Sequence, residues 1–112
     1  MRHCLLLDLV DDEALIAEYE ARHLRIWPEV AVHLRTAGVI EMTIHRLGTR
    51  LVMILDVEDD FSFEALAQAE RENPTIAHWE EAMGRYQRPT RWARQGQKWT
   101  LAKRIFTLSE QP

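Results

Sequence analysis

Cysteine is almost absent from this chain of 112 residues, and its scarcity excludes two kinds of scaffold. Cys4 has no second cysteine to form an intramolecular disulfide, and there is no cluster of thiols for a zinc site. Long apolar runs are missing as well. The longest, residues 51–55, is far shorter than the roughly 20 residues that span a membrane. We expect a reduced, cytoplasmic protein with no secretory signal and no membrane partner.

The sequence also lacks the motifs that hold metals, nucleotides or covalent intermediates. Its five histidines show no spacing typical of a metal site. Its four glycines form no phosphate-binding loop, and no motif marks a serine or cysteine nucleophile. We therefore expect neither a metal nor a cofactor.

Charge is abundant, at 29% of residues, and it is unevenly placed. Residues 83–108 carry seven basic side chains and no acidic one, although the formal net charge is -4, so the rest of the chain sums to -11. Trp92 and Trp99 are interleaved with these cations, a pattern that also fits nucleic acid. In an acidic chain we favour docking of this basic segment on an acidic body or partner subunit, and we expect no nucleic-acid partner.

The spacing of apolar residues predicts the order of the secondary structure. Alternating or continuous apolar segments predict strands at 3–10, 39–46, 50–58 and 101–108. Helical spacing predicts a stretch over 12–37 that Pro28 divides near residues 24–27, and two further helices at 59–73 and 75–86. Gly38 is expected to end the second helix, and residues 47–49 to form a hairpin.

This order predicts a single α+β domain, residues 1–112, with a ferredoxin-like βαββαβ fold. The expected four-stranded antiparallel sheet carries its helices on one face. Met42 falls on the face expected to meet the helices, and His45 on the opposite face. Because the strands are apolar on both faces, we expect the second face to be covered by another copy of the chain in a homodimer.

A tyrosine and a histidine give the first indication of chemistry. Tyr19 and His23 are four residues apart and therefore share one face of a helix. Histidine has an ordinary pKa of about 6.5, which lets it give or accept protons near neutrality. By spacing alone, such a pair is more often a packed core edge with a local hydrogen bond than a catalytic dyad.

A wider set of motifs gives the pair more weight. These motifs are Tyr19-x-x-x-His23-x-x-x-Trp27-Pro28-Glu29, Gly38, Asn73-Pro74, Trp79-x-x-x-Met83 and residues 105–108. Together they resemble the L-rhamnose mutarotase family over nearly all of residues 3–108. Its members are small dimeric α/β barrels that interconvert the α and β anomers of a 6-deoxy-L-sugar without a cofactor. The resemblance implies that His23 is the proton donor, that Tyr19 contacts the sugar and that Trp79 forms an apolar wall.

Two positions depart from the rhamnose-acting members of that family. Met42 stands where those members have a tyrosine, and Glu80 where they have a second tryptophan. Residues 59–64, 79–80, 87 and 96–99 instead resemble a branch associated with L-fucose. A carboxylate at Glu80 accepts hydrogen bonds from ring hydroxyls, whereas an indole donates only one. Met42 and Glu80 are therefore expected to bind the sugar, and the choice between L-fucose and L-rhamnose stays open.

Mutarotation requires only an acid and a base. The acid protonates the ring oxygen while the base removes a proton from the anomeric hydroxyl, and the open chain closes on the other face of its carbonyl. His23 is the expected acid, and Tyr19, Glu80 or a water is the base. Trp92 and Trp99 either anchor the basic segment or complete the site. A noncatalytic dimeric barrel that binds a small ligand is the main alternative, and a dimeric-barrel monooxygenase a weaker one.

Overall fold

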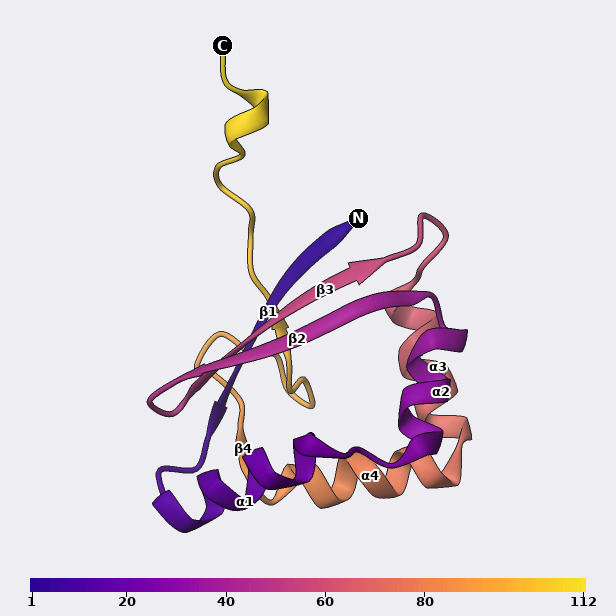
Figure 1. The fold of residues 1–112 in the computed structure, drawn as a ribbon, viewed down its shortest axis with the longest axis vertical. Coiled ribbons are helices and arrows are strands. Elements are labelled where there is room, and N and C mark those ends of the chain that lie inside the picture. Colours follow the sequence, from indigo (N-terminus) through magenta and orange to yellow (C-terminus); the bar gives the residue numbers. More distant parts are fainter.

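An antiparallel sheet carries four helices on one of its faces in the computed structural model, which describes residues 1–112 (Figure 1). Three long strands form the sheet, β1 (Arg2–Leu9), β2 (Val39–Leu47) and β3 (Arg50–Val57). They lie in the order β2-β3-β1, and β4 (Gln87–Arg88) follows on the free edge of β1. The predicted ferredoxin-like α+β fold is confirmed, but the sheet has five strands instead of the predicted four, and within one chain it does not close on itself.

Two short segments share the free edge of β1. β4 pairs with Asp8 and Leu9, while β5 (Thr100–Leu101) pairs with Leu5 and Leu6. The predicted strand over 101–108 is therefore wrong except at its first residue. Beyond Ala102 the chain leaves the sheet and protrudes as a tail that ends in a short 3-10 helix, η1 (Leu108–Glu110) (Figure 1). Its apolar residues have no strand of the same chain beside them, so they form no ladder.

The helices begin and end where local side chains cap them. They are α1 (Glu13–Leu24), α2 (Pro28–Thr36), α3 (Phe63–Glu72) and α4 (Pro74–Gly84). The carboxylate of Asp12 accepts a hydrogen bond from the amide of Leu15 at 3.0 Å, and Asn73 caps α4 through the amide of Thr75 at 3.0 Å. The predicted breaks before Pro28 and Pro74 are confirmed, because proline fits a first turn but not a helix interior.

Two predicted helix ends were misplaced. Ser62 caps α3 by accepting from the amide of Ala65 at 3.1 Å, so this helix begins at Phe63 and not at residue 59. α4 ends at Gly84 and not at residue 86. Gly38 ends α2 as predicted, with a φ of +100° that favours glycine.

The core lies between the sheet and the helices. Alternate residues of β1 and β3 turn their side chains toward the helices and are buried, namely Leu5, Leu7, Leu9, Leu51, Met53, Leu55 and Val57. On the opposite face the apolar side chains of Leu6, Val52 and Ile54 are only half-buried. None of the four helices is both long enough and apolar enough to cross a membrane.

Candidate active site

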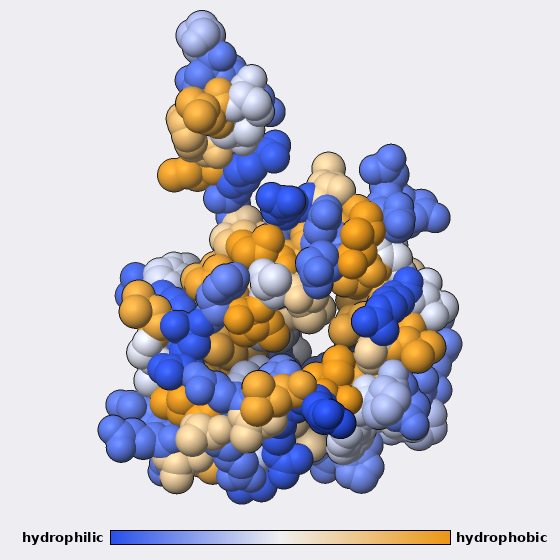
Figure 2. Space-filling model, viewed as in Figure 1, coloured by the Kyte–Doolittle hydropathy of each residue, from blue (hydrophilic) through white to orange (hydrophobic).

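A cavity of about 650 Å³ lies between the sheet and the helix layer, and Figure 2 shows the surface hollowed there. Its volume is in the range of small-molecule sites. All five residues that the sequence predicted for the site line it: Tyr19, His23, Met42, Trp79 and Glu80. Three different elements, α1, β2 and α4, therefore bring the sequence-predicted residues together.

His23 is held in one tautomer by the backbone of its own helix. Its Nδ1 lies 2.8 Å from the carbonyl oxygen of Tyr19, one turn earlier in α1. A carbonyl oxygen only accepts, so Nδ1 carries the hydrogen. The other ring nitrogen, Nε2, is left to exchange a proton with a molecule in the cavity.

Tyr19 packs its ring against that of His23 and is almost wholly buried. The two ring centroids are 4.3 Å apart and the ring planes are inclined at 37°, so this contact accompanies the local hydrogen bond to the backbone. The hydroxyl of Tyr19 accepts a hydrogen bond from the side-chain amide of Gln87 at 3.2 Å. Burial raises the pKa of the Tyr19 phenol above its ordinary value. The phenol therefore stays protonated at neutral pH and can donate a hydrogen bond to a ligand.

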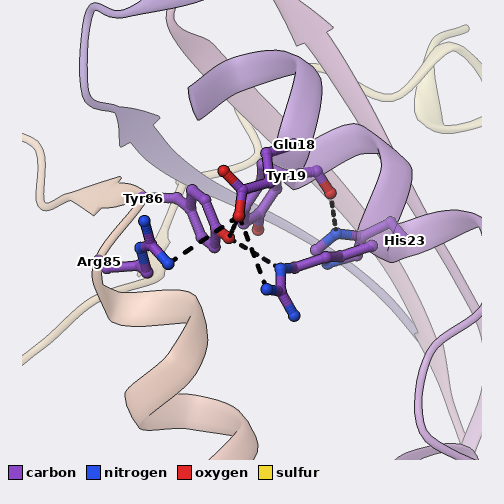
Figure 3. Close-up of polar contacts among 6 residues, drawn as sticks. Glu18, Tyr19, His23, Arg85 and Tyr86 are labelled. Atoms are coloured by element: carbon purple, nitrogen blue, oxygen red, sulfur yellow. Dashed lines mark hydrogen bonds and ion pairs between the residues drawn. The ribbon is translucent and has the colours of Figure 1, made fainter. Parts of the chain in front are cut away.

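A polar network outside the cavity fixes the helix that carries His23 (Figure 3). The hydroxyl of Tyr86 donates to the carboxylate of Glu18 at 2.7 Å and accepts from Nε of Arg22 at 2.8 Å. Arg85 lies 3.9 Å from the same carboxylate. The hydrogen bond from Tyr86 is the main reason that the pKa of Glu18 is lowered. These contacts tie α1 to the end of α4 and thereby position His23 against Trp79.

Aromatic rings form one wall of the cavity. Trp79 is only 6% exposed, with its ring 5.8 Å from that of His23 and 5.1 Å from that of Trp27. Trp99 also lines the cavity of its own chain. His78 does not line the cavity and packs its ring against Trp27 instead. Trp79 and Trp99 thus offer apolar surface to a bound molecule.

Trp92 lies outside the cavity, on the surface of the basic segment. Its side chain is 61% exposed, and the guanidinium groups of Arg91 and Arg50 lie 4.4 and 5.9 Å from its ring. The predicted docking of the basic segment on acidic residues is confirmed at two points, where Arg85 meets Glu18 and Lys98 meets Glu80.

The cavity also has polar residues that sequence reasoning did not assign to the site. They are His33, Glu70, Arg71, Gln87 and Lys98. Nζ of Lys98 donates to the backbone carbonyl of Glu80 at 2.9 Å and lies 3.9 Å from its carboxylate. Burial raises the pKa of the Glu80 carboxyl, while Lys98 and His33 act in the opposite direction.

Glu70 lies on α3 in the same helical register as the apolar residues Phe63, Leu66 and Ala67. This register is the feature of the sequence that could have indicated its inward position.

Two polar atoms in the lining have no hydrogen-bond partner within the protein. They are Oε1 of Gln87 and Nε2 of His33, and both atoms are buried. Unpaired buried polar atoms are costly, and such atoms in a cavity mark positions where a ligand's polar groups complete the bonding. Oε1 of Gln87 accepts hydrogen bonds, and the imidazole of His33 donates or accepts them. A hydroxyl group both donates and accepts, so the site suits hydroxyl groups.

The fold and the cavity define a class of protein: a ferredoxin-like α+β protein with a mixed polar and aromatic small-molecule site between its sheet and helices. A dimeric ferredoxin-like protein from an uncultured marine organism has this fold, with a TM-score of 0.54 and 12% identity over 95% of this chain and 90% of that one. An L-rhamnose mutarotase from Formosa agariphila is more similar, with a TM-score of 0.71 and 18% identity over 96% of this chain and 98% of that one.

Sequence comparison identifies the family. The profile of the L-rhamnose mutarotase family matches residues 2–108. An L-fucose mutarotase from Xanthomonas campestris pv. campestris is 45% identical over 97% of this chain and 89% of its own. The chain belongs to the L-rhamnose mutarotase family, as its motifs predicted, and the predicted enzyme class, an isomerase, is confirmed with it.

Proposed function

We propose that the protein interconverts the α and β anomers of a 6-deoxy-L-hexose, with L-fucose preferred to L-rhamnose, by acid and base catalysis without a cofactor. The convergence of His23, Tyr19 and Trp79 on one cavity carries the proposal. The preference for L-fucose is supported by the 45% identical relative named for that sugar, and by the carboxylate of Glu80 in the lining.

In the proposed mechanism, protonated His23 donates from Nε2 to the ring oxygen of the sugar. The Nδ1 hydrogen bond to Tyr19 keeps the ring oriented in both protonation states. The neutral phenol of Tyr19 donates a hydrogen bond to a sugar oxygen, and Trp79 packs against the apolar C–H face of the ring. Met42 joins the apolar part of the lining, and Glu80 accepts hydrogen bonds from ring hydroxyls.

We expect the purified protein to accelerate anomeric exchange of L-fucose and, more slowly, of L-rhamnose. Saturation-transfer NMR on the anomeric protons of each sugar measures the exchange rate against buffer alone. Lack of acceleration with either sugar would contradict the proposed activity. Binding of a sugar without faster exchange would instead support the noncatalytic alternative.

Glu80→Ala is expected to lower kcat/KM for L-fucose by about 10- to 100-fold, because sugar hydroxyls lose a charged acceptor. Met42→Leu conserves the volume of an apolar side chain and serves as the control, with an expected change of a few fold. Steady-state rates from the same NMR exchange measurement give both values. Equal effects of the two substitutions would contradict a sugar-binding role for Glu80.

We further propose that the protein is a homodimer. The support comes from the half-buried apolar side chains on the outer face of the sheet and from the exposed side chains of Ile105, Phe106 and Leu108 in the protruding tail. A second copy of the chain would cover both surfaces. We also propose that the protein works in the cytoplasm, where the thiol of Cys4 stays reduced.

A further inference from the structure

Glu70 is the one carboxyl in the cavity lining without a polar partner. It lies on α3, partly buried, and its carboxylate makes no ion pair and no hydrogen bond with the rest of the protein. Glu80, by contrast, lies beside Lys98. A partly buried carboxylate without a partner destabilises a fold, so its presence at a cavity indicates a use there.

The surroundings of Glu70 favour its protonated form. Burial raises its pKa from 4.5 to about 7, and the negative charge of Glu80 on α4 adds to this effect. Lys98, on the loop before β5, and Arg71, on α3 itself, act in the opposite direction. A carboxylate of this kind is a stronger base than an ordinary one, and about half of it is ionised at neutral pH.

The two carboxyls of the lining are therefore suited to different tasks. Glu80 lies beside Lys98, and both Lys98 and His33 act against the rise in its pKa that burial causes, which suits an acceptor of hydrogen bonds. Glu70 is left to gain and lose a proton. Tyr19, another candidate for the base, has a raised pKa and stays neutral.

We propose that Glu70 is the general base of the reaction, a role that rests on the mutarotase activity proposed above. The carboxylate of Glu70 removes the proton from the anomeric hydroxyl while His23 donates a proton from Nε2 to the ring oxygen. The bond between the anomeric carbon and the ring oxygen breaks, and a carbonyl forms. After rotation about the adjacent carbon–carbon bond, Glu70 returns its proton to the carbonyl oxygen and His23 takes the proton of the attacking hydroxyl, so both residues are restored.

Glu70→Gln tests the role, because glutamine has the size of glutamate but cannot act as a base. We expect kcat for L-fucose to fall by about 100-fold or more, with KM changed by at most about threefold. Ionisation of Glu70 should produce the rising limb of the wild-type pH profile, on the acid side of its optimum, and this limb should be lost in the variant. Glu64→Gln, at the exposed first turn of the same helix, is the control, with an unchanged rate and pH profile.

The outcomes separate this inference from the proposed function. If the wild type accelerates exchange but Glu70→Gln keeps its kcat and its pH profile, the base lies elsewhere and only the inference fails. A rise in KM with kcat unchanged would also overturn it, because it would make Glu70 a binding residue. If the wild type accelerates no exchange, the proposed function itself fails.

Direct titration provides a readout that does not depend on activity. In protein labelled with ¹³C at the glutamate side chains, the resonance lost in Glu70→Gln should titrate near pH 7 in the wild type. Its pKa should fall in Glu80→Gln, which removes a negative charge, and rise in Lys98→Met, which removes a positive one. The folded state binds this proton more tightly than the unfolded state, so the free energy of unfolding should fall as pH rises from about 4.5 to 7. Glu70→Gln should make that fall smaller, and the raised pKa of Glu80 accounts for a remaining part. A resonance that titrates at the ordinary carboxyl pKa would contradict the proposal.

Discussion

His23→Asn is expected to lower the enzymatic rate of anomeric exchange by about 100- to 10,000-fold, the usual contribution of a positioned acid or base. The asparagine amide can still donate to the carbonyl oxygen of Tyr19, so the substitution removes the exchangeable proton of Nε2 while the helix keeps its local hydrogen bond. Saturation-transfer NMR with L-fucose gives the rate, and circular dichroism checks that the fold is retained.

His78→Asn is the matched control for this loss. His78 lies on α4 next to Trp79, but it is exposed and does not line the cavity. Its replacement is expected to leave the exchange rate within about twofold of the wild type, in keeping with the small effects of surface substitutions. Full activity in His23→Asn would exclude His23 as the acid, and a similar loss in both variants would point to general damage to α4 or α1.

Replacing the three apolar side chains of the tail by serine, in Ile105→Ser/Phe106→Ser/Leu108→Ser, is expected to convert the dimer to a monomer. Burial of each of these side chains would stabilise the dimer by about 1.5–3 kcal/mol. Every dimer would contain two tails. A loss of even 4 kcal/mol raises the dissociation constant about 1,000-fold. Sedimentation velocity at micromolar concentration distinguishes the two states.

The tail also offers a control for that experiment. Lys103→Ser changes an exposed polar residue of the same segment and should leave the dimer intact. A wild type that sediments as a monomer would contradict the homodimer. A dimer that survives the triple substitution would place the interface on the outer face of the sheet alone.

Local signals were enough to predict most of the fold. Pro28 and Asn73–Pro74 divide the helices, and Gly38 ends α2, because each acts through the backbone of its own neighbourhood. The tail could not be predicted in this way. Its apolar pattern is that of a strand, but whether a strand forms depends on a neighbouring strand, and the sequence does not show that β5 ends at Leu101.

The site was predicted in part for a related reason. His23, Tyr19 and Trp79 stand in motifs whose spacing is visible along the chain, and the fold places them around one cavity. Glu70 shares the inward register of α3, but its approach to Glu80 depends on how α3 packs against α4, which the sequence does not show. Lys98 belongs to a basic segment whose path only the tertiary structure determines.

The residues around the cavity come from separate elements, and this separation affects how the sugar preference of the enzyme can change. The proposed proton donor, His23, lies on α1, where a backbone hydrogen bond and the Tyr86 network hold it. Met42 and Glu80, which face the substrate in the proposed site, lie on β2 and α4. Substitutions at those two positions leave the support of the histidine untouched. In the proposed site, sugar preference can therefore change during evolution by exchange of wall residues while the proton donor keeps its support. A change at Glu80 would in addition shift the pKa of Glu70.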